Sequence, residues 1–359
     1  MKTGFVLLLL VLAETALYAQ EFMEDSEKDF PLRSKVQLQV SNTQGDLFVQ
    51  GWSLDNKIRV KARKRVVADK EAQAKPLFSG VEYSYRSSDE NIEITSQYGA
   101  SLSIEDRLQE KEHPRIHMDL TLFVPSKLKL QIWAVEGKVT LRNWNAPVEI
   151  RSNRGAIHID SINTSLISLL CPSCSVQARN IFGSLRCIGG SGLIDLSRVS
   201  AKDVYVETDS GGIKLAHVEG NQLYVSKTGN VDGQFLSGKV QFSAHQTSID
   251  FKEVSGLLSG RVEKGNVTAT FKDQTFSENA LIEAIHGNVS LTLPRRFSSE
   301  VDLWSVQGTT QLDFSLQRSE DARLSKRSAN RLVVRVGDGG ELLKVFSETG
   351  NIHLTREHF

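Results

Sequence analysis

Residues 137–144 (GKVTLRNW) and residues 155–162 (GAIHIDSI) decide the fold of this chain, because they are two copies of one short pattern. In each copy a small residue is followed by apolar residues at the third, fifth and eighth positions. The third-position residue, here called the seed, recurs every 18 or 19 residues: Val139, Ile157, Val176, Ile194, Ile213, Val231, Ile249 and Val267. A register held so closely over successive copies indicates an internal structural repeat.

A second alternating run precedes the seed in each repeat, as in residues 148–150 (VEI), 167–169 (ISL) and 204–206 (VYV). Alternation with a period of two indicates half-buried strands, and helical spacing is absent. Each repeat is therefore expected to form two short strands. The turns between them carry glycines, where the backbone must bend or pack closely: Gly137, Gly155, Gly192, Gly211, Gly229 and Gly265.

One such coil cannot bury its apolar side alone, but stacked coils can, because each strand pairs with its counterparts about 4.8 Å away. The sequence therefore predicts an all-β fold, a single-stranded β-solenoid (β-helix) of about 18-residue coils with irregular N- and C-terminal coils. A β-sandwich of unrelated short strands is the alternative.

Residues 131–359 are predicted to form the repetitive solenoid, with a charged loop at 317–331 and a last copy of the pattern at 350–354 (GNIHL). Residues 20–130 are predicted to be the opening of the same structure. Within them, residues 45–52 (GDLFVQGW) match the pattern, and Trp52 takes the place of Trp144.

The N-terminal region interrupts the pattern with other elements. Strands are expected over 58–67, 81–95 and 116–124, and a short helix within 68–78. An independent N-terminal domain remains the alternative.

Residues 1–19 have the features of a signal peptide: Lys2, an apolar run at 5–13 (FVLLLLVLA) and Ala19 at the expected cleavage site. The run is too short to span a bilayer, and no later stretch contains eighteen apolar residues. We therefore expect a periplasmic, extracellular or cell-surface protein with no transmembrane segment in its mature chain. A buried N-terminal helix is the alternative.

The composition excludes several classes of protein. The 359 residues include 43 basic and 43 acidic side chains, so the net charge is zero, which argues against a nucleic-acid partner. With 40% hydrophobic and 24% charged residues, the chain is not disordered as a whole. Three cysteines are too few for a disulfide-framework miniprotein.

Several segments resemble the DUF4097 family of adhesin-like proteins. Residues 44–52 (QGDLFVQGW) and 57–62 (KIRVKA) are similar to the opening of that family, and 122–125 (LFVP) with 135–139 (VEGKV) to its transition into the repeats. The resemblance implies an exported bacterial β-solenoid without a catalytic signature. Cys174 and Thr247 depart from the pattern, since they occupy turns where it prefers glycine.

The residue after each seed should form an outward column on the stacked coils. Asp232 and Asp250 are neighbours in that column, about 5 Å apart at the backbone. Two carboxyl groups at such a separation suit a retaining glycosidase. The alternative is a solvated ladder in which Lys214 offsets the charge of Asp195 and Asp232.

Arg59, Lys61 and Arg63 alternate with apolar residues and should form a basic stripe on one outer face. This stripe is the candidate binding surface for an anionic envelope polymer or lipid head groups. A solvated strand that protects an exposed sheet edge is the alternative interpretation.

The cysteines and histidines do not predict a metal, a cofactor or a redox centre. Cys171 and Cys174 have the spacing of a redox motif but lie in an expected β-turn, so a local disulfide and two free thiols both remain open. Cys187 falls at an inward position. His113 and His117 lie about 13 Å apart on an extended chain, too far for one metal ion.

The leading hypothesis is an exported, non-enzymatic, adhesin-like solenoid. It would bind an envelope or extracellular polymer or protein by multivalent contact, with the outward column and the basic stripe as surfaces. The alternatives are a polysaccharide-active hydrolase or lyase that uses Asp232 and Asp250, and a purely structural envelope module.

Overall fold

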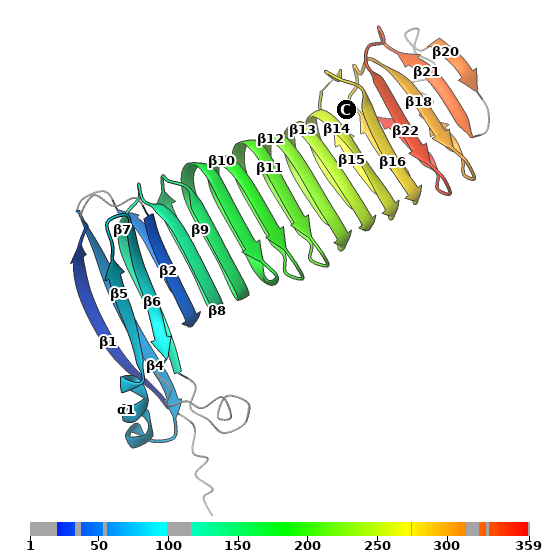
Figure 1. Ribbon diagram of the computed structural model, residues 1–359. Helices are drawn as coiled ribbons and strands as arrows, with labels where there is room; N and C mark the ends of the chain where they lie inside the picture. Colours follow the sequence, from blue (N-terminus) through cyan, green and yellow to red (C-terminus); the bar gives the residue numbers. More distant parts are fainter. Residues whose placement is uncertain are drawn as a thin grey trace, which may run out of the picture.

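A computed structural model describes residues 20–32, 37–52, 56–98, 116–273, 275–313, 323–327 and 330–357. Figure 1 shows a rod of stacked coils with less regular strands at both ends. The described chain contains one helix, α1 (Glu71–Ser79), and otherwise strands and turns. The predicted all-β solenoid is confirmed.

The strands form three groups along the chain: an N-terminal group, the coils, and a C-terminal group. The first group is β1 (Gln20–Pro31), β2 (Gln37–Gln44), β3 (Leu47–Trp52), β4 (Lys57–Ala68), β5 (Val81–Ser87), β6 (Asn91–Tyr98) and β7 (Ile116–Pro125). The coils are β8 (Lys129–Trp144), β9 (Val148–Cys171), β10 (Ser173–Gly189), β11 (Ile194–Thr208), β12 (Ile213–Thr228), β13 (Val231–Gln246), β14 (Ile249–Lys264) and β15 (Val267–Phe271). The last group is β16 (Ala280–His286), β17 (Val289–Leu293), β18 (Ser299–Ser305), β19 (Thr310–Leu312), β20 (Arg323–Arg327), β21 (Arg331–Val336), β22 (Leu342–Ser347) and β23 (Ile352–Arg356).

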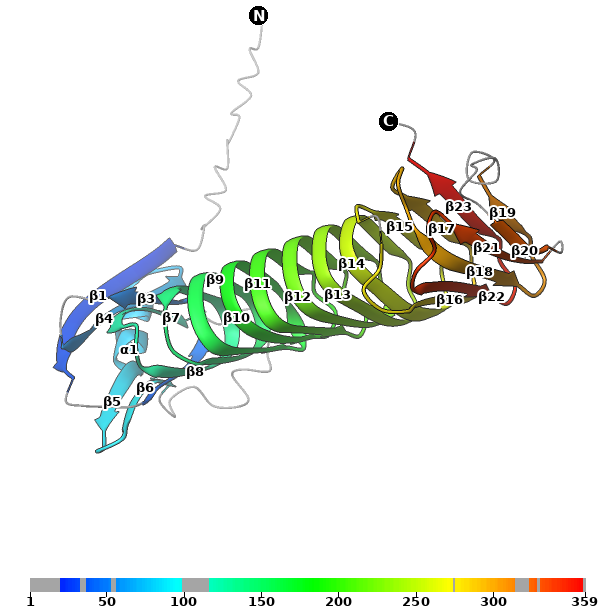
Figure 2. The same ribbon diagram turned by 90° about the horizontal axis from the view of Figure 1, so that it is seen from above.

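Each coil strand bends at a corner, so the stack has two walls with the core between them (Figure 2). Wall A contains the seeds, and its strand order is β1–β4–β7–β3, then β8 to β15 in sequence, then β17–β23–β19. Wall B contains the second run of each repeat. Its order is β5–β6–β2, then β8 to β14, then β16–β22–β18–β21–β20.

The seeds pair with one another in register across parallel strands, from Val139 with Ile157 through to Ile249 with Val267. All eight are at most 1% exposed, so they form one column of the core. Trp144 is also fully buried, and its indole N–H donates to the carbonyl of Leu128 at 3.1 Å. The repeat therefore places apolar side chains inward at every coil, which is the main stabilising term of the rod.

Left-handed residues turn the chain at more than one corner of a coil. At one corner, Gly155 has φ +108°, and a Cβ there would lie 2.1 Å from the carbonyl oxygen of Gly137 on the coil before. At a second corner each coil from β8 to β14 uses a left-handed residue that is not glycine. With φ between 53° and 59°, these form the corner column: Asn143, Ser161, Asn180, Arg198, His217, Phe235 and Glu253.

The N-terminal region joins the coils through strand pairing. β2 pairs with β6 and β8, and β3 pairs with β7 and β8, all in parallel. β1 and β4 extend wall A by antiparallel pairing, and α1 packs against β4. The strands predicted over 58–67 and 116–124 and the short helix are confirmed. The single strand predicted over 81–95 is instead a hairpin, because the chain turns between β5 and β6, which pair antiparallel.

The C-terminal end departs from the predicted loop. Residues 323–327, inside the charged segment 317–331, form β20, which pairs antiparallel with β21. A charged strand of this kind is suited to a sheet edge, because it resists pairing with other chains. The last copy of the pattern, in β23, lies between β17 and β19. The predicted signal peptide at 1–19 lies outside the described residues.

Candidate functional site

One outward row of side chains runs along wall A from the N-terminal strands through the coils. Its members pair strand by strand and none is buried: Lys61, Thr121, Phe48, Thr140, His158, Gln177, Asp195, Lys214, Asp232, Asp250 and Thr268. We call this set the outer row. The basic stripe and the aspartate pair, which the sequence predicted as separate surfaces, therefore lie on the same wall.

The basic stripe faces the acidic strand β1. Antiparallel register places Arg59 opposite Asp29, Lys61 opposite Glu27 and Arg63 opposite Asp25. The nitrogen–oxygen distances are 2.9 Å for Arg59 with Asp29, 3.0 Å for Lys61 with Glu27 and 2.8 Å for Arg63 with Asp25. Each cation of the stripe thus has a carboxylate partner.

These pairs stabilise the charged forms of the β1 carboxylates. Hydrogen bonds from Arg59 and then Lys57 lower the pKa of Asp29 to about 2. A hydrogen bond from Arg63 lowers the pKa of Asp25. The carboxylates are exposed and Lys57 and Arg59 are partly exposed, so the pairs contribute little to stability. Binding of a polymer by the basic stripe stays a prediction. Because the carboxylates of β1 pair with its cations, the stripe has far less net positive charge than its own sequence indicates.

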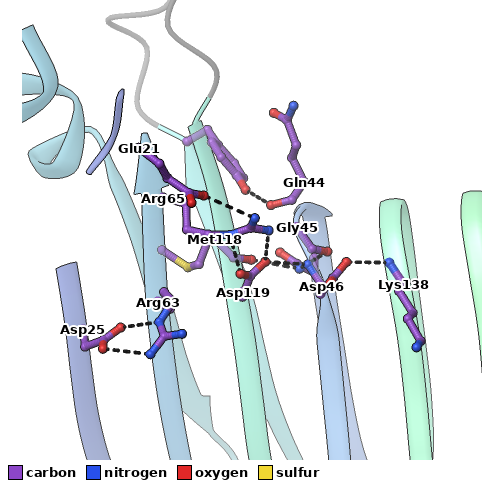
Figure 3. Close-up of polar contacts among 12 residues, drawn as sticks. Glu21, Asp25, Gln44, Gly45, Asp46, Arg63, Arg65, Met118, Asp119 and Lys138 are labelled. Atoms are coloured by element: carbon purple, nitrogen blue, oxygen red, sulfur yellow. Dashed lines mark hydrogen bonds and ion pairs between the residues drawn. The ribbon is translucent and has the colours of Figure 1, made fainter. Parts of the chain in front are cut away.

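A polar cluster joins the N-terminal strands to the first coil (Figure 3). The guanidinium of Arg65 donates to Asp119 through Nη2 at 2.9 Å, and its Nε lies 2.6 Å from the other carboxylate oxygen. Asp119 also accepts from the backbone N–H of Asp46 at 2.8 Å, and Asp46 accepts from the backbone N–H of Lys138 at 2.9 Å. This chain of contacts crosses β4, β7 and β8 and fixes their relative positions.

The side chain of Tyr98 adds a further link, because its hydroxyl donates to the carbonyl of Gln44. Burial raises the pKa of Tyr98 to about 12, so the phenol stays protonated. A depression of about 580 Å³ lies over this region, lined on one side by Asp25 and Arg63 and on the other by Asp46 and Phe48.

Lys138, Arg142 and Arg179 surround His158 at the start of the coils. Lys138 and Arg142 lie on β8, His158 on β9 and Arg179 on β10, and all three cations are exposed. None of the three makes an ion pair in the part of the chain that the structure describes. We call these three residues the cation cluster.

Asp160 and Phe48 are neighbours of the two arginines of the cluster. Asp160 lies between Arg142 and Arg179 in the strand register, but its Oδ1 accepts from Asn180 at 2.7 Å, at the corner. Arg142 lies over the ring of Phe48, 5.8 Å from its centroid.

The cation cluster also affects the pKa of His158. Burial lowers the pKa of the imidazole, and the charges of Lys138, Arg179 and Arg142 lower it further. The neutral imidazole therefore predominates at neutral pH. An anion bound among the three cations would raise the pKa of His158.

Asp232 and Asp250 are direct neighbours on β13 and β14, as predicted. Lys252 lies 3.9 Å from the carboxylate of Asp250, and Lys214 is the neighbour of Asp232 on the other side. The pair borders a shallow depression of about 330 Å³ whose lining also includes Asp195. The geometry is that of a charged ladder on a flat wall.

The cysteines occupy two environments. Cys171 and Cys174 form a disulfide at the turn between β9 and β10, with 5.4 Å between their Cα atoms. Cys187 is buried in the core as predicted, and burial raises the pKa of its thiol to about 12.

His113 lies outside the described residues, and His117 is on β7. Within the described ranges, no three His, Cys, Asp or Glu side chains gather in a metal-binding arrangement. No helix in the same ranges has the length and apolar character needed to cross a membrane.

The family model for Toastrack DUF4097 matches residues 66–355, which is most of the chain. The chain belongs to the Toastrack DUF4097 family. The resemblance seen in the repeats is thereby confirmed, and the β-helix-like fold agrees with it. No curated protein matches this Toastrack chain.

Two crystal structures are similar to this Toastrack chain at low identity. One is named a "putative cell adhesion protein" from Clostridium sporogenes; it shares 11% identity with a TM-score of 0.25, covering 94% of this chain and 100% of its own. The other is named a "putative lipid binding protein" from Parabacteroides distasonis; it shares 11% identity with a TM-score of 0.37, covering 92% of this chain and 96% of its own. Neither likeness is close enough to carry a functional argument.

The sequence analysis missed the cation cluster and the acidic partner strand of this Toastrack chain. A signal for the strand existed, since residues 21–29 (EFMEDSEKD) contain five carboxylates. A signal for the cluster existed as well. Arg142 and Arg179 occupy the same outward position two repeats apart, three residues after their seeds, and Lys138 directly precedes the seed of the first repeat.

Proposed function

We propose that this chain is an exported, non-enzymatic, adhesin-like β-solenoid that binds an anionic polysaccharide of the envelope or extracellular space along wall A. The observation that supports it is the cation cluster, whose three positive charges make no ion pair among the described residues. Export is supported by the predicted signal peptide. Binding by repeated contact suits a rod in which one outward row continues over many coils.

The energetics favour several weak contacts. A single exposed ion pair contributes about 0.2–1 kcal/mol, which is too little for useful affinity. An extended polyanion that contacts the cluster and the following coils gains affinity because later contacts are intramolecular. Binding of this kind weakens as salt rises, since the Debye length falls to about 8 Å at physiological ionic strength.

A polysaccharide-active enzyme is the second candidate, and one observation favours it. Asp232 and Asp250 are adjacent in register and border a depression large enough for part of a sugar ring. Lys252 and Lys214 beside them support the charged-ladder interpretation instead, because each neutralises part of the carboxylate charge.

One experiment tests both candidates. Protein produced from the full 359-residue chain is sedimented with anionic cell-wall polysaccharide, and released reducing ends are measured in the same tube. We expect saturable, salt-sensitive binding without new ends. Neutral dextran is the control for charge. New ends that vanish in Asp232→Asn or Asp250→Asn would establish the enzyme and overturn the proposal.

Three glutamine variants locate the surface. Replacing Lys138, Arg142 and Arg179 should weaken binding by roughly tenfold or more, because each cation contributes about 1 kcal/mol near an anionic surface. A matched control removes three exposed cations outside the cluster: Lys202, Lys264 and Lys272. Equal losses in both variants would contradict a defined site.

The third variant replaces Arg59, Lys61 and Arg63. Since β1 already neutralises these cations, we expect a smaller loss than for the cation cluster. A larger loss would assign the binding surface to the stripe that the sequence predicted.

A further inference from the structure

A groove follows the corner column across β10, β11, β12 and β13, away from the outer row. Its volume is about 440 Å³, within the range of small-ligand sites. The floor is apolar, formed by Val199 and Val218, which are at most 2% exposed. The rims hold aromatic rings and polar groups: Phe182, Arg198, Ser200, His217, Glu219, Phe235 and Ser237.

The aromatic groups are arranged in two ways. His217 and Phe235 stack on adjacent coils with 4.5 Å between ring centroids and 10° between planes, so they line the groove as one wall. Phe182 stands at one end, where 55% of its surface is exposed and no ring contacts it among the described residues. An exposed phenylalanine without a partner ring is free to stack on a ligand.

The backbone along this rim is left-handed at residues that are not glycine, as it is at the same position of the other coils from β8 to β14. Arg198, His217 and Phe235 all adopt left-handed φ values between 54° and 57°. Asn143 and Asn180 occupy the same corner on earlier coils, and asparagine tolerates this conformation. Ser161 before the groove and Glu253 beyond it are left-handed as well, so the conformation belongs to the coil. What distinguishes the groove is the residue type, with Arg198, His217 and Phe235 at consecutive corners.

The other rim supplies hydrogen-bonding groups. Ser200 and Ser237 each offer a hydroxyl, which donates and accepts. Glu219 offers an acceptor, and its carboxylate makes only a weak contact with Ser200, at 3.4 Å. Arg198 is held in place by a 2.6 Å hydrogen bond from its Nε to Asn180. A ligand with one apolar face and several hydroxyls would satisfy both rims.

The strand arrangement favours a saccharide over a peptide. Peptides commonly bind as an added strand at a free sheet edge. Here β11 and β12 are central strands, each paired on both sides, and the groove runs across them. From β10 to β13 the groove spans three strand spacings, or about 14 Å, which is long enough for a short oligosaccharide.

We propose that the corner groove binds a neutral stretch of a saccharide chain, with a sugar ring stacked on Phe182 and sugar hydroxyls bonded to Ser200, Glu219 and Ser237. This proposal rests on the proposed function and deepens it, because it assigns recognition of sugar rings to a site separate from the cation cluster. On one polymer, the corner groove would bind sugar rings and the cation cluster would bind anionic groups.

The test uses the full chain and three tetrasaccharides: β-1,4-linked N-acetylglucosamine, β-1,4-linked glucose and α-1,4-linked glucose. Binding is measured by calorimetry. We expect saturable binding of at least one tetrasaccharide at millimolar affinity or better, weakened roughly tenfold by Phe182→Ala. Leu166→Ala is the matched control, since Leu166 is 51% exposed and does not line the groove.

A second variant separates binding from folding. Phe235→Asn places a residue suited to φ +57° at the strained corner, so the melting temperature should hold or rise while saccharide binding falls. Loss of binding together with loss of stability would indicate a structural role for Phe235 and contradict the proposal.

The remaining outcomes are also decisive. No binding of any tetrasaccharide at millimolar concentration, or binding unchanged in both variants, would overturn the proposal. So would tighter binding of an aromatic tetrapeptide than of the sugars. The cation-cluster variant should still bind the neutral tetrasaccharides, so failure of the groove and failure of the proposed function are distinguishable.

Discussion

The start of wall A and the coils that follow it arrange their charges differently. In the antiparallel strands, Arg59, Lys61 and Arg63 each face a carboxylate from a distant segment. In the coils, parallel in-register stacking places the same position of successive repeats side by side. Charge compensation there depends on differences between repeats, as at Asp195 and Lys214. Antiparallel pairing gives every cation of the stripe a carboxylate partner, whereas the parallel repeat leaves the cation cluster without ion pairs among the described residues.

The largest effect is expected from a change that breaks the coils. Gly155→Val should destabilise the protein by about 3 kcal/mol or more, because its Cβ would meet the Gly137 carbonyl at 2.1 Å and φ is +108°. Thermal unfolding measures the loss. Gly212→Ala is the control, since a Cβ there has 3.5 Å to its nearest neighbour. Equal melting temperatures for Gly155→Val and wild type would show that backbone stacking does not limit stability.

A moderate effect is expected at the junction of the two regions. Asp119→Ala removes the partner of Arg65 and of the Asp46 backbone N–H, at a cost of about 1–3 kcal/mol. Asp250→Ala, the same substitution on the flat wall, should cost far less. Chemical denaturation compares them. A cost for Asp250→Ala as large as that for Asp119→Ala would contradict the distinction between junction and ladder.

A smaller, local effect is expected at His158. Its pKa, followed by NMR, should lie below the ordinary value of 6.5 and rise when Lys138 and Arg179 are changed to glutamine. Because the folded state disfavours the protonated imidazole, its contribution to stability falls as pH drops below 6.5. Added anionic polysaccharide should raise the same pKa. If the pKa of His158 responds to neither change, the three cations do not act together on the imidazole, and the cation cluster is contradicted.

The smallest effect is expected in the antiparallel strands. The pKa of Asp29 is lowered to about 2, so its stabilising contribution is present above the unfolded value near 4 and is lost as pH falls toward 2. Asp29→Asn should therefore reduce the change in melting temperature over that range. Because Asp29 is exposed, the difference should be slight. A large difference would mean that the β1–β4 pairs are important for folding.

Prediction from sequence succeeded where the repeat dictates contacts. The spacing of the seeds alone specifies that Val139 lies beside Ile157 and that Asp232 lies beside Asp250. It failed for Arg63, because its partner Asp25 is 38 residues away and antiparallel pairing has no period to reveal it. It also failed for the corner groove. His217 and Phe235 share a spacing but no residue type, so their common left-handed backbone is visible only in three dimensions.

The position of β23 between β17 and β19 has a consequence for the order in which the chain assembles. During synthesis, residues 310–312 emerge before residues 352–356, yet the later strand lies inside the stack and the earlier one outside it. β22 is inserted in the same way between β16 and β18. The distal end therefore cannot be completed coil by coil from the N-terminus. The positions between β16 and β18 and between β17 and β19 therefore stay unpaired until residues 342–356 have been synthesised.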